Sequence, residues 1–393
     1  MGFQDGAGEP PAGCARLARV TVSLPSDPPG ARRLTGVVPE LIAALRGASD
    51  QWAPARSAIV CVVDGLGAHN LRARSGHARY LAAAMSKKDV ARTVFPTTTA
   101  AALTSLLTGT EPGTHGIVGY RAFVPDTGEV LNQLRGWDTH GLPVSWQRAA
   151  PLFGREAEAG RPTFFVSKPE YTGTGFTEAT LRGAVAVPAE DFSDRVDLAV
   201  DLAARHPGAL IYLYTPELDG IGHRRGWESD EWTIGLEDVD AALARLGGAL
   251  PGDVGAIVTA DHGMVDVPRH RHRLLVEGSP LLEGVAQIGG EPRMLHLYAD
   301  PGTADDVADA WRAAESPHAW VLTRDEAVAS GLFGDVDPVV RPRIGDVLVA
   351  ARGATAYYDD RDAERTGQQM VGQHGSLTDA ERIVPLIRLG AFA

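Results

Sequence analysis

The sequence is poor in cysteine, and this scarcity excludes one class of small protein. Only two of its 393 residues are cysteines, Cys14 and Cys61. A secreted scaffold held by disulfides, or a structural zinc site made of a cysteine cluster, needs more of them. Cys61 lies inside an apolar run, where a cysteine packs as a small hydrophobe. A chain of this length can instead bury a large hydrophobic core.

The sequence also lacks long apolar runs and an excess of basic charge. No segment approaches the length of a transmembrane helix, so we expect no membrane partner. Residues 1–13 show neither the basic n-region nor the apolar h-region of a secretory signal, and we therefore expect a cytoplasmic protein. The net charge of −13 gives no reason to expect nucleic acid as a partner. The oligomeric state does not follow from these features.

Aspartates follow three apolar runs of the chain. They are Asp64 after residues 57–63, Asp219 shortly after residues 209–214, and Asp261 after residues 255–260. The first run is long enough for a buried strand and too short for a helix. The carboxyl ends of parallel strands meet at one edge of a sheet, where open α/β sheets bind their ligands. The three carboxylates are therefore expected at a common site.

Imidazole side chains accompany these carboxylates. Asp219 and His223 are four residues apart, so one helical turn places both on the same face, where they can share a metal ion. Asp261 and His262 are adjacent and can converge only on an irregular turn, which the following glycine permits. His374, in the motif Gly372-Gln373-His374-Gly375, is a further candidate. A mixture of carboxylate and imidazole suits Zn²⁺ or Mn²⁺ better than Ca²⁺.

Each of these features taken alone is more often structural. An aspartate that closes a strand usually belongs to a turn or caps a helix, and a single histidine usually packs in the fold. Their joint occurrence is what indicates a two-metal hydrolase site.

A threonine-rich turn precedes a short helix. Pro96 and the threonines 97–99 favour an extended entry and an N-cap, residues 100–107 favour a helix, and Gly109 ends it. One threonine hydroxyl therefore lies at a helix N-terminus, where free N–H groups and the helix dipole favour a phosphate. A metal ion bound to that hydroxyl lowers its pKa enough to make it a nucleophile. The alternative interpretation is an ordinary capped core helix.

In order and context, five motifs resemble those of the alkaline phosphatase superfamily. They are Asp64-Gly65, the threonine segment ending in Thr108-Gly109, Asp219-Gly220-Ile221-Gly222-His223, Asp261-His262-Gly263-Met264 and Gln373-His374-Gly375. The similarity is greatest to the nucleotide pyrophosphatase/phosphodiesterase branch and extends over about residues 57–390. It implies an α/β fold with a central, mostly parallel sheet flanked by helices, and two divalent metal ions, most often zinc.

The resemblance implies a division of the metal ligands into two sets. Asp64, Asp261 and His262 are expected to hold the ion that activates the nucleophile, and Asp219, His223 and His374 are expected to hold the second ion.

The resemblance also points to a nucleophile. In the family the nucleophile precedes the Thr-Gly at the end of its helix by nine positions, which indicates Thr99 as nucleophile and as a further metal ligand. Family members usually carry an Asn that donates a hydrogen bond to the phosphoryl oxygen, and this chain has Tyr120 in that place. A Tyr hydroxyl can donate the same bond, while an aromatic wall residue is the other interpretation of Tyr120.

Two other groups of residues leave their role open. The basic run 268–273 could steer phosphate, although such runs are usually solvated loops. Trp137, Phe164, Phe165 and Lys168 could line a leaving-group pocket, although aromatic residues near strands are more often core.

The pattern of expected strands and helices changes after Asp261. Residues 1–53 are expected to form an N-terminal arm, residues 54–266 and 369–393 the metallohydrolase core, and residues 267–368 an inserted α+β module.

The most consistent hypothesis is a metal-dependent hydrolase of small-molecule phosphate diester or pyrophosphate bonds that forms a covalent phospho-threonine. The three residues after Thr99 are alanines, which provide no charged clamp for a dianionic monoester. A phosphomonoesterase and a phosphonate C–P hydrolase are alternatives of the same superfamily. A non-catalytic binding protein that retains the fold is the alternative from another class.

Overall fold

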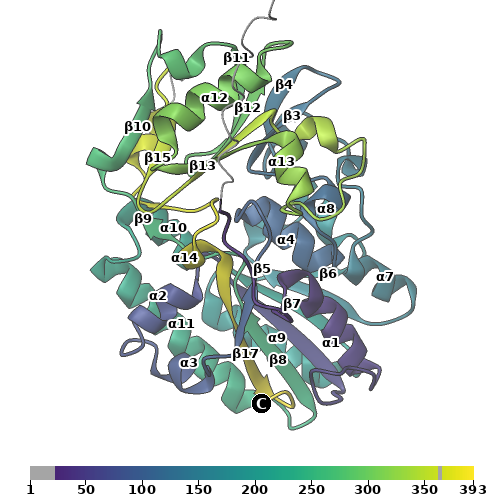
Figure 1. Ribbon diagram of the computed structural model, residues 1–393. Coiled ribbons are helices and arrows are strands. Elements are labelled where there is room, and N and C mark those ends of the chain that lie inside the picture. Colours follow the sequence, from purple (N-terminus) through teal and green to yellow (C-terminus); the bar gives the residue numbers. More distant parts are fainter. Residues whose placement is uncertain (1–22, 362–364) are drawn as a thin grey trace, which may run out of the picture.

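The described residues of the computed structural model, 23–361 and 365–393, contain a seven-stranded sheet that lies in the lower half of Figure 1. In spatial order its strands are β2 (Val90–Arg92), β17 (Ile383–Gly390), β8 (Val254–Thr259), β1 (Ser57–Val63), β7 (Leu210–Thr215), β5 (Thr163–Ser167) and β6 (Val185–Pro188). The strands from β8 to β6 are parallel, whereas β17 is antiparallel to both of its neighbours. Every residue of β1, β7 and β8 is buried, as expected for strands covered by helices on both faces.

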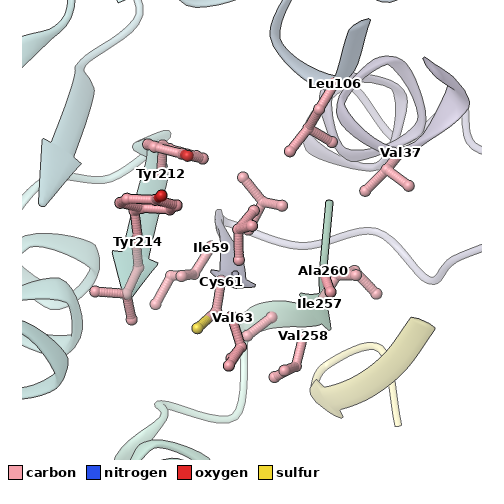
Figure 2. Packing of buried hydrophobic residues seen from close by; sticks show 14 of the residues in the cluster. Val37, Ile59, Cys61, Val63, Leu106, Tyr212, Tyr214, Ile257, Val258 and Ala260 are labelled. Atoms are coloured by element: carbon pink, nitrogen blue, oxygen red, sulfur yellow. The ribbon is translucent and has the colours of Figure 1, made fainter. Parts of the chain in front are cut away.

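Helices flank this sheet. Helix α9 (Phe192–Arg205) packs against β1, β5 and β7, and α11 (Asp230–Ala249) packs against α9. Helix α1 (Val37–Leu45) packs against β1 and α4 (Thr99–Thr108), and Figure 2 shows Val37 and Leu106 of these two helices in the same buried cluster as the β1 residues. The other helices of this part are α2 (Ala68–Ala73), α3 (Arg79–Ala84), α5 (Pro112–His115), α6 (Gly136–Thr139), α7 (Leu152–Glu158), α8 (Gly175–Leu181), α10 (Glu217–Arg225) and α14 (Asp379–Arg382). The predicted α/β class with a mostly parallel central sheet is confirmed.

A second, antiparallel sheet lies in the upper half of Figure 1. Its strands in spatial order are β11 (Val285–Glu291), β12 (Met294–Ala299), β14 (Val347–Ala351) and β13 (Ala319–Thr323). Helix α12 (Ala304–Glu315) covers one face with Trp311, whereas α13 (Arg324–Ala329) contacts β13 and β14. These elements fall within residues 267–368, but the hairpin of β3 (Arg121–Val124) and β4 (Glu129–Asn132) also contacts β11. The division into core and inserted module stays a prediction.

Short pairings return the end of the chain to the main sheet. Strand β16 (Gly372–Gln373) pairs with β9 (Val265–Asp266), and Thr97 forms an isolated bridge with Gly375. His374 is therefore held between the turn after β8 and the entry to α4. The remaining pair consists of β10 (His272–Leu275) and β15 (Ala356–Asp359).

Cys61 is buried in β1, and Cys14 lies outside the described residues. Among the residues that the structure describes, none of the helices combines the length and the apolar character needed to span a bilayer.

A fully buried ion pair connects the second sheet to the turns near His374. The Arg293 guanidinium donates to both carboxylate oxygens of Glu381, over 2.7 and 2.8 Å, and both side chains are 0% exposed. Glu381 also accepts a hydrogen bond from the Ser376 amide, and its carbonyl accepts one from the Gly263 amide. Arg293 and Glu381 thus link the start of β12 to the two turns that carry His262 and His374.

Breaking this pair is expected to destabilise the protein strongly. Arg293→Met leaves the Glu381 charge buried without its partner, which costs about 3–5 kcal/mol of unfolding free energy. The double variant with Glu381→Gln removes that charge and keeps an acceptor for the Ser376 amide, so it should recover part of the loss. Urea denaturation of the three proteins measures both effects. A loss below about 1 kcal/mol for Arg293→Met would mean that solvent reaches the pair.

Candidate metal centre

The first group of ligand atoms forms where β1 and β8 end. Asp64 follows β1, and Asp261 and His262 follow β8, so the parallel pairing of these strands brings the three side chains together. One ligand atom from each lies within 4.8 Å of the others. The Nε2 atom of His262 is 3.5 Å from Oδ1 of Asp64 and 3.4 Å from Oδ2 of Asp261. All three residues are buried.

The second group contains Asp219 of α10 and His374. Ligand atoms of Asp219, His262 and His374 lie within 4.8 Å of one another, and the rings of His262 and His374 stack with centroids 3.6 Å apart. His223 lies one helical turn beyond Asp219, with its Nε2 atom 3.4 Å from Oδ1 of Asp219. All six predicted ligands therefore meet at one edge of the sheet, with His262 between the two groups.

Backbone carbonyls orient the three imidazole rings. The Nδ1 atom of each ring lies within hydrogen-bond distance of a carbonyl oxygen. The pairs are His223 with Gly372 (2.8 Å), His262 with Gly263 (3.2 Å) and His374 with Thr97 (2.9 Å). A carbonyl only accepts, so Nδ1 carries the proton in each ring and the Nε2 lone pair is free to bind a cation. Burial lowers the pKa of His374, and the neighbouring His262 and His223 lower it further, which favours the neutral form that binds metals.

Buried carboxylate oxygens without partners mark the same place. Within the described ranges 23–361 and 365–393, Oδ1 of Asp64, Oδ1 of Asp219 and Oδ2 of Asp261 have no hydrogen-bond partner. Burial raises the pKa of Asp64, and the charges of Asp261 and Asp219 raise it further. Negative charges in contact are costly away from water unless cations compensate them. Three carboxylates and three imidazoles whose Nε2 atoms carry a lone pair fit divalent ions of the zinc type.

Thr99 is the first residue of α4 and lies beside this group. Its hydroxyl oxygen is 3.1 Å from Nε2 of His262, and the side chain is half-buried. The Thr97 hydroxyl instead donates to the Ser376 carbonyl and accepts from the Gly375 amide, and the Thr98 hydroxyl is buried beside the Glu291 carboxylate. Of the three candidate threonines, Thr99 alone places its hydroxyl at the candidate metal ligands.

A cavity of about 860 Å³ opens over the site. Thr99, Asp219, His374 and Tyr120 all border it, and Tyr120 is half-buried. Its apolar wall includes Leu103, Leu107, Phe165, Leu181, Tyr212 and Tyr214. Thr99, Leu103 and Leu107 are spaced by four residues, so one face of α4 carries the hydroxyl and continues as apolar wall.

The two groups of residues whose role was left open lie at different places in the structure. Phe165 and Lys168 border the cavity, but Phe164 and Trp137 do not, and the Trp137 indole donates to the Gln133 carbonyl. From the basic run, Arg269 and His272 border a separate cavity of about 380 Å³.

Two residues of the site were missed by the sequence interpretation. Glu291, the last residue of β11, borders the cavity, and its Oε2 atom is 3.6 Å from Nδ1 of His374. It is 8% exposed, and burial raises its pKa. Tyr214 of β7 borders the cavity and hydrogen-bonds Asp64. The apolar run of β7 could have indicated a buried Tyr, but no sequence signal singles out Glu291.

A parallel sheet that gathers aspartates and histidines beside a threonine at a helix N-terminus is the arrangement of the alkaline phosphatase superfamily. Within it, residues 58–377 match the model of the type I phosphodiesterase / nucleotide pyrophosphatase family. The chain belongs to this family. An uncharacterised pyrophosphatase/phosphodiesterase of Schizosaccharomyces pombe is 29% identical over 193 residues, which cover 45% of this chain and 38% of that protein. The chain thus matches well under half the length of this relative.

Solved structures share the fold. Murine ectonucleotide pyrophosphatase/phosphodiesterase 5 is 21% identical and has a TM-score of 0.66, with 84% of this chain and 87% of that chain covered. An inactive threonine-to-alanine variant of that protein, in complex with AMP, gives the same TM-score at 20% identity, with 86% and 88% covered. Phosphonoacetate hydrolase from Sinorhizobium meliloti, in complex with phosphonoformate, is 20% identical with a TM-score of 0.64, and 86% and 91% are covered.

Proposed function

We propose that the chain is a metal-dependent hydrolase of phosphodiester or pyrophosphate bonds in small-molecule substrates. The observation that carries the proposal is the set of unpartnered, buried oxygens on Asp64, Asp219 and Asp261 beside the Thr99 hydroxyl. Bound divalent cations compensate the negative charges of these carboxylates. The Thr99 hydroxyl then lies next to the positive charge of the cations. Membership of the phosphodiesterase family supports the same reaction class.

Each predicted ligand has a role in this proposal. Asp64, Asp261 and His262 hold one ion, with Thr99 as a further ligand, and Asp219, His223 and His374 hold the other. The ions, zinc or alternatively manganese, supply Lewis acidity that lowers the pKa of the Thr99 hydroxyl and stabilises charge on the phosphoryl group.

Thr99 is the proposed nucleophile. Its oxygen attacks phosphorus while the bond to the leaving alkoxide or phosphate breaks, and the Thr99 proton ends on that leaving group. Water then attacks the phospho-threonine, releases the phosphate monoester and restores the Thr99 hydroxyl. The free N–H groups in the first turn of α4 donate to the phosphoryl oxygens, and the Tyr120 hydroxyl donates a further hydrogen bond. Murine phosphodiesterase 5, whose threonine-to-alanine variant is inactive, supports a role for a threonine in this fold.

The cavity wall favours a substrate with a second organic substituent. Ala100, Ala101 and Ala102 follow Thr99 and provide no positive charge for the extra negative oxygen of a monoester, although Arg135, Lys168 and Arg224 border the cavity. Near the apolar wall, the hydroxyls of Thr177 and Thr180 donate to backbone carbonyls and are not free for a ligand. The second substituent of a diester can therefore lie against the apolar wall, where its burial is favourable.

We expect bis(p-nitrophenyl) phosphate to be cleaved with a higher kcat/KM than p-nitrophenyl phosphate. Both substrates release the same phenolate, so the comparison isolates the response to charge and to the second substituent. Initial rates of protein supplied with Zn²⁺ or Mn²⁺ give the ratio, and protein treated with a chelator is the control. A preference for the monoester by roughly tenfold, equivalent to about 1.4 kcal/mol of transition-state binding, would move the assignment to a phosphomonoesterase.

Phosphonate C–P bond hydrolysis is the second candidate. It is favoured by the fold shared with phosphonoacetate hydrolase over most of both chains. Release of inorganic phosphate from phosphonoacetate, measured under the same metal conditions, separates this candidate from the diesterase.

A further inference from the structure

Tyr214 connects the apolar wall of the cavity to the candidate metal centre. Its hydroxyl donates a hydrogen bond to Oδ2 of Asp64, and the residue is 8% exposed. The contact follows from the sheet register, because Tyr214 of β7 lies opposite Val62 of β1. Asp64 is two residues beyond Val62 and therefore lies on the same side of the sheet as the Tyr214 ring.

The hydrogen bond makes the two oxygens of Asp64 unequal. Oδ2 is occupied by the Tyr214 hydroxyl, whereas Oδ1 has no hydrogen-bond partner and lies 3.5 Å from Nε2 of His262. Oδ1 is therefore the oxygen available to a cation held with His262 and Asp261. Residues that hydrogen-bond a metal ligand fix its orientation and commonly raise the affinity for the ion.

The Tyr214 ring is itself held from several directions. It stacks on Tyr212 with centroids 6.0 Å apart and an angle of 14°, and Figure 2 shows the two parallel rings on β7. The Tyr171 ring packs against it in a T-shaped arrangement with centroids 5.7 Å apart, and the buried Arg195 fixes the strand beneath the ring by donating to the backbone carbonyl of Tyr214 over 2.8 Å. Little rotational freedom remains for the ring, so its hydroxyl has a defined direction.

We propose that Tyr214 is a positioning residue that sets the coordination of one metal ion by holding Oδ2 of Asp64. This inference rests on the proposed function, because it requires that Asp64, Asp261 and His262 bind an ion. Tyr214 acts on the ion through Asp64, while its ring also forms part of the apolar wall of the cavity. Removing its hydroxyl should free Asp64 to rotate and should weaken the binding of this ion, while the ion at Asp219 and His223 is retained.

Zn²⁺ binding by Tyr214→Phe tests the proposal without any need for turnover. Metal-free protein is titrated with Zn²⁺ in competition with a chromophoric chelator. We expect one of two ions to bind roughly 10 to 100 times more weakly than in the wild type. Tyr212→Phe is the matched control, because it removes the same group from the same strand, and no side chain in the described ranges accepts a hydrogen bond from that hydroxyl. Its Zn²⁺ affinity should equal that of the wild type.

Asp64→Asn provides a second measurement that separates positioning from a general packing effect. This variant should weaken the same ion, and adding Tyr214→Phe to it should cause no further loss, because the two residues act as one unit. If Tyr214→Phe has reduced activity, that activity should recover toward the wild-type value as the Zn²⁺ concentration rises. The proposal is overturned if Tyr214→Phe binds both ions like the wild type, if Tyr212→Phe loses as much, or if the losses with Asp64→Asn add.

The outcomes also distinguish this inference from the proposed function. A wild-type protein that binds two Zn²⁺ ions and hydrolyses diesters, with an unaffected Tyr214→Phe variant, refutes the positioning role alone. A wild-type protein that binds no Zn²⁺ refutes both.

Discussion

Thr99→Ala is expected to lower kcat by on the order of 10⁴ to 10⁶, the range found when a covalent nucleophile is removed from a hydrolase. The Thr99 hydroxyl lies 3.1 Å from Nε2 of His262, at the N-terminus of α4, and no neighbouring threonine offers its hydroxyl to the same group. Because Thr99 is half-buried and its side chain ends in the cavity, the substitution should leave the fold intact. Initial rates with a diester, together with Zn²⁺ content, measure the two effects separately.

Neighbouring threonines serve as controls. Thr98→Ala removes a hydroxyl that lies beside the Glu291 carboxylate and, among the described residues, hydrogen-bonds none of the six predicted metal ligands, so it should have a much milder effect on the rate. Thr97→Ala loses two hydrogen bonds near Gly375 and should lower stability more than the intrinsic rate. Thr99→Ser keeps a hydroxyl and should retain partial activity. Near-normal turnover by Thr99→Ala combined with loss of activity in one neighbour would move the nucleophile to that neighbour.

The meeting of the aspartates could be predicted because it depends on sheet topology. Asp64 and Asp261 follow strands that are buried throughout, and parallel neighbours place their carboxyl ends at one edge. The pairing of Asp219 with His223 depends only on helical spacing, and α10 begins two residues before Asp219. Apolar strand runs and helical spacing are local features of the sequence. They were sufficient to predict that these residues lie close together, and the loop conformations were not needed.

The position of His262 between the two groups could not be predicted. Its ring direction depends on the hydrogen bond from Nδ1 to the Gly263 carbonyl and on stacking with His374, which is more than a hundred residues away. Glu291 was missed for a related reason, because its place depends on how the second sheet packs against the turn at Gly375, where a side chain would collide with the Glu291 carboxylate. Tyr214 lies in an apolar run, and such a run does not say which residue of the next strand its hydroxyl will meet.

The antiparallel direction of β17 also could not be predicted from the hydrophobic pattern of the sequence. This strand begins directly after the short helix α14, and its apolar residues carry no signal of its direction relative to β8. The Arg293–Glu381 pair fixes this helix, and neither residue has a local pattern that identifies a partner 88 positions away. Contacts between distant segments therefore account for the features that escaped prediction, in the fold as well as in the site.

Asp219→Asn is expected to reduce kcat/KM by on the order of 10³ or more, because a metal ion supplies several kcal/mol of charge stabilisation in the transition state and each 1.36 kcal/mol is a factor of ten. The substitution keeps the shape of the side chain and removes the charge of an oxygen that has no hydrogen bond among the residues that the structure describes. That oxygen is 3.4 Å from Nε2 of His223 and 4.0 Å from Nε2 of His374, so its loss should weaken the binding of the ion that these histidines hold.

The measurements are diester turnover and metal content by atomic absorption. The matched control is Asp253→Asn, which changes an exposed aspartate paired with Arg56. His374→Ala should reproduce the loss through the same ion, whereas losses below roughly tenfold in both variants would exclude a catalytic ion at this position.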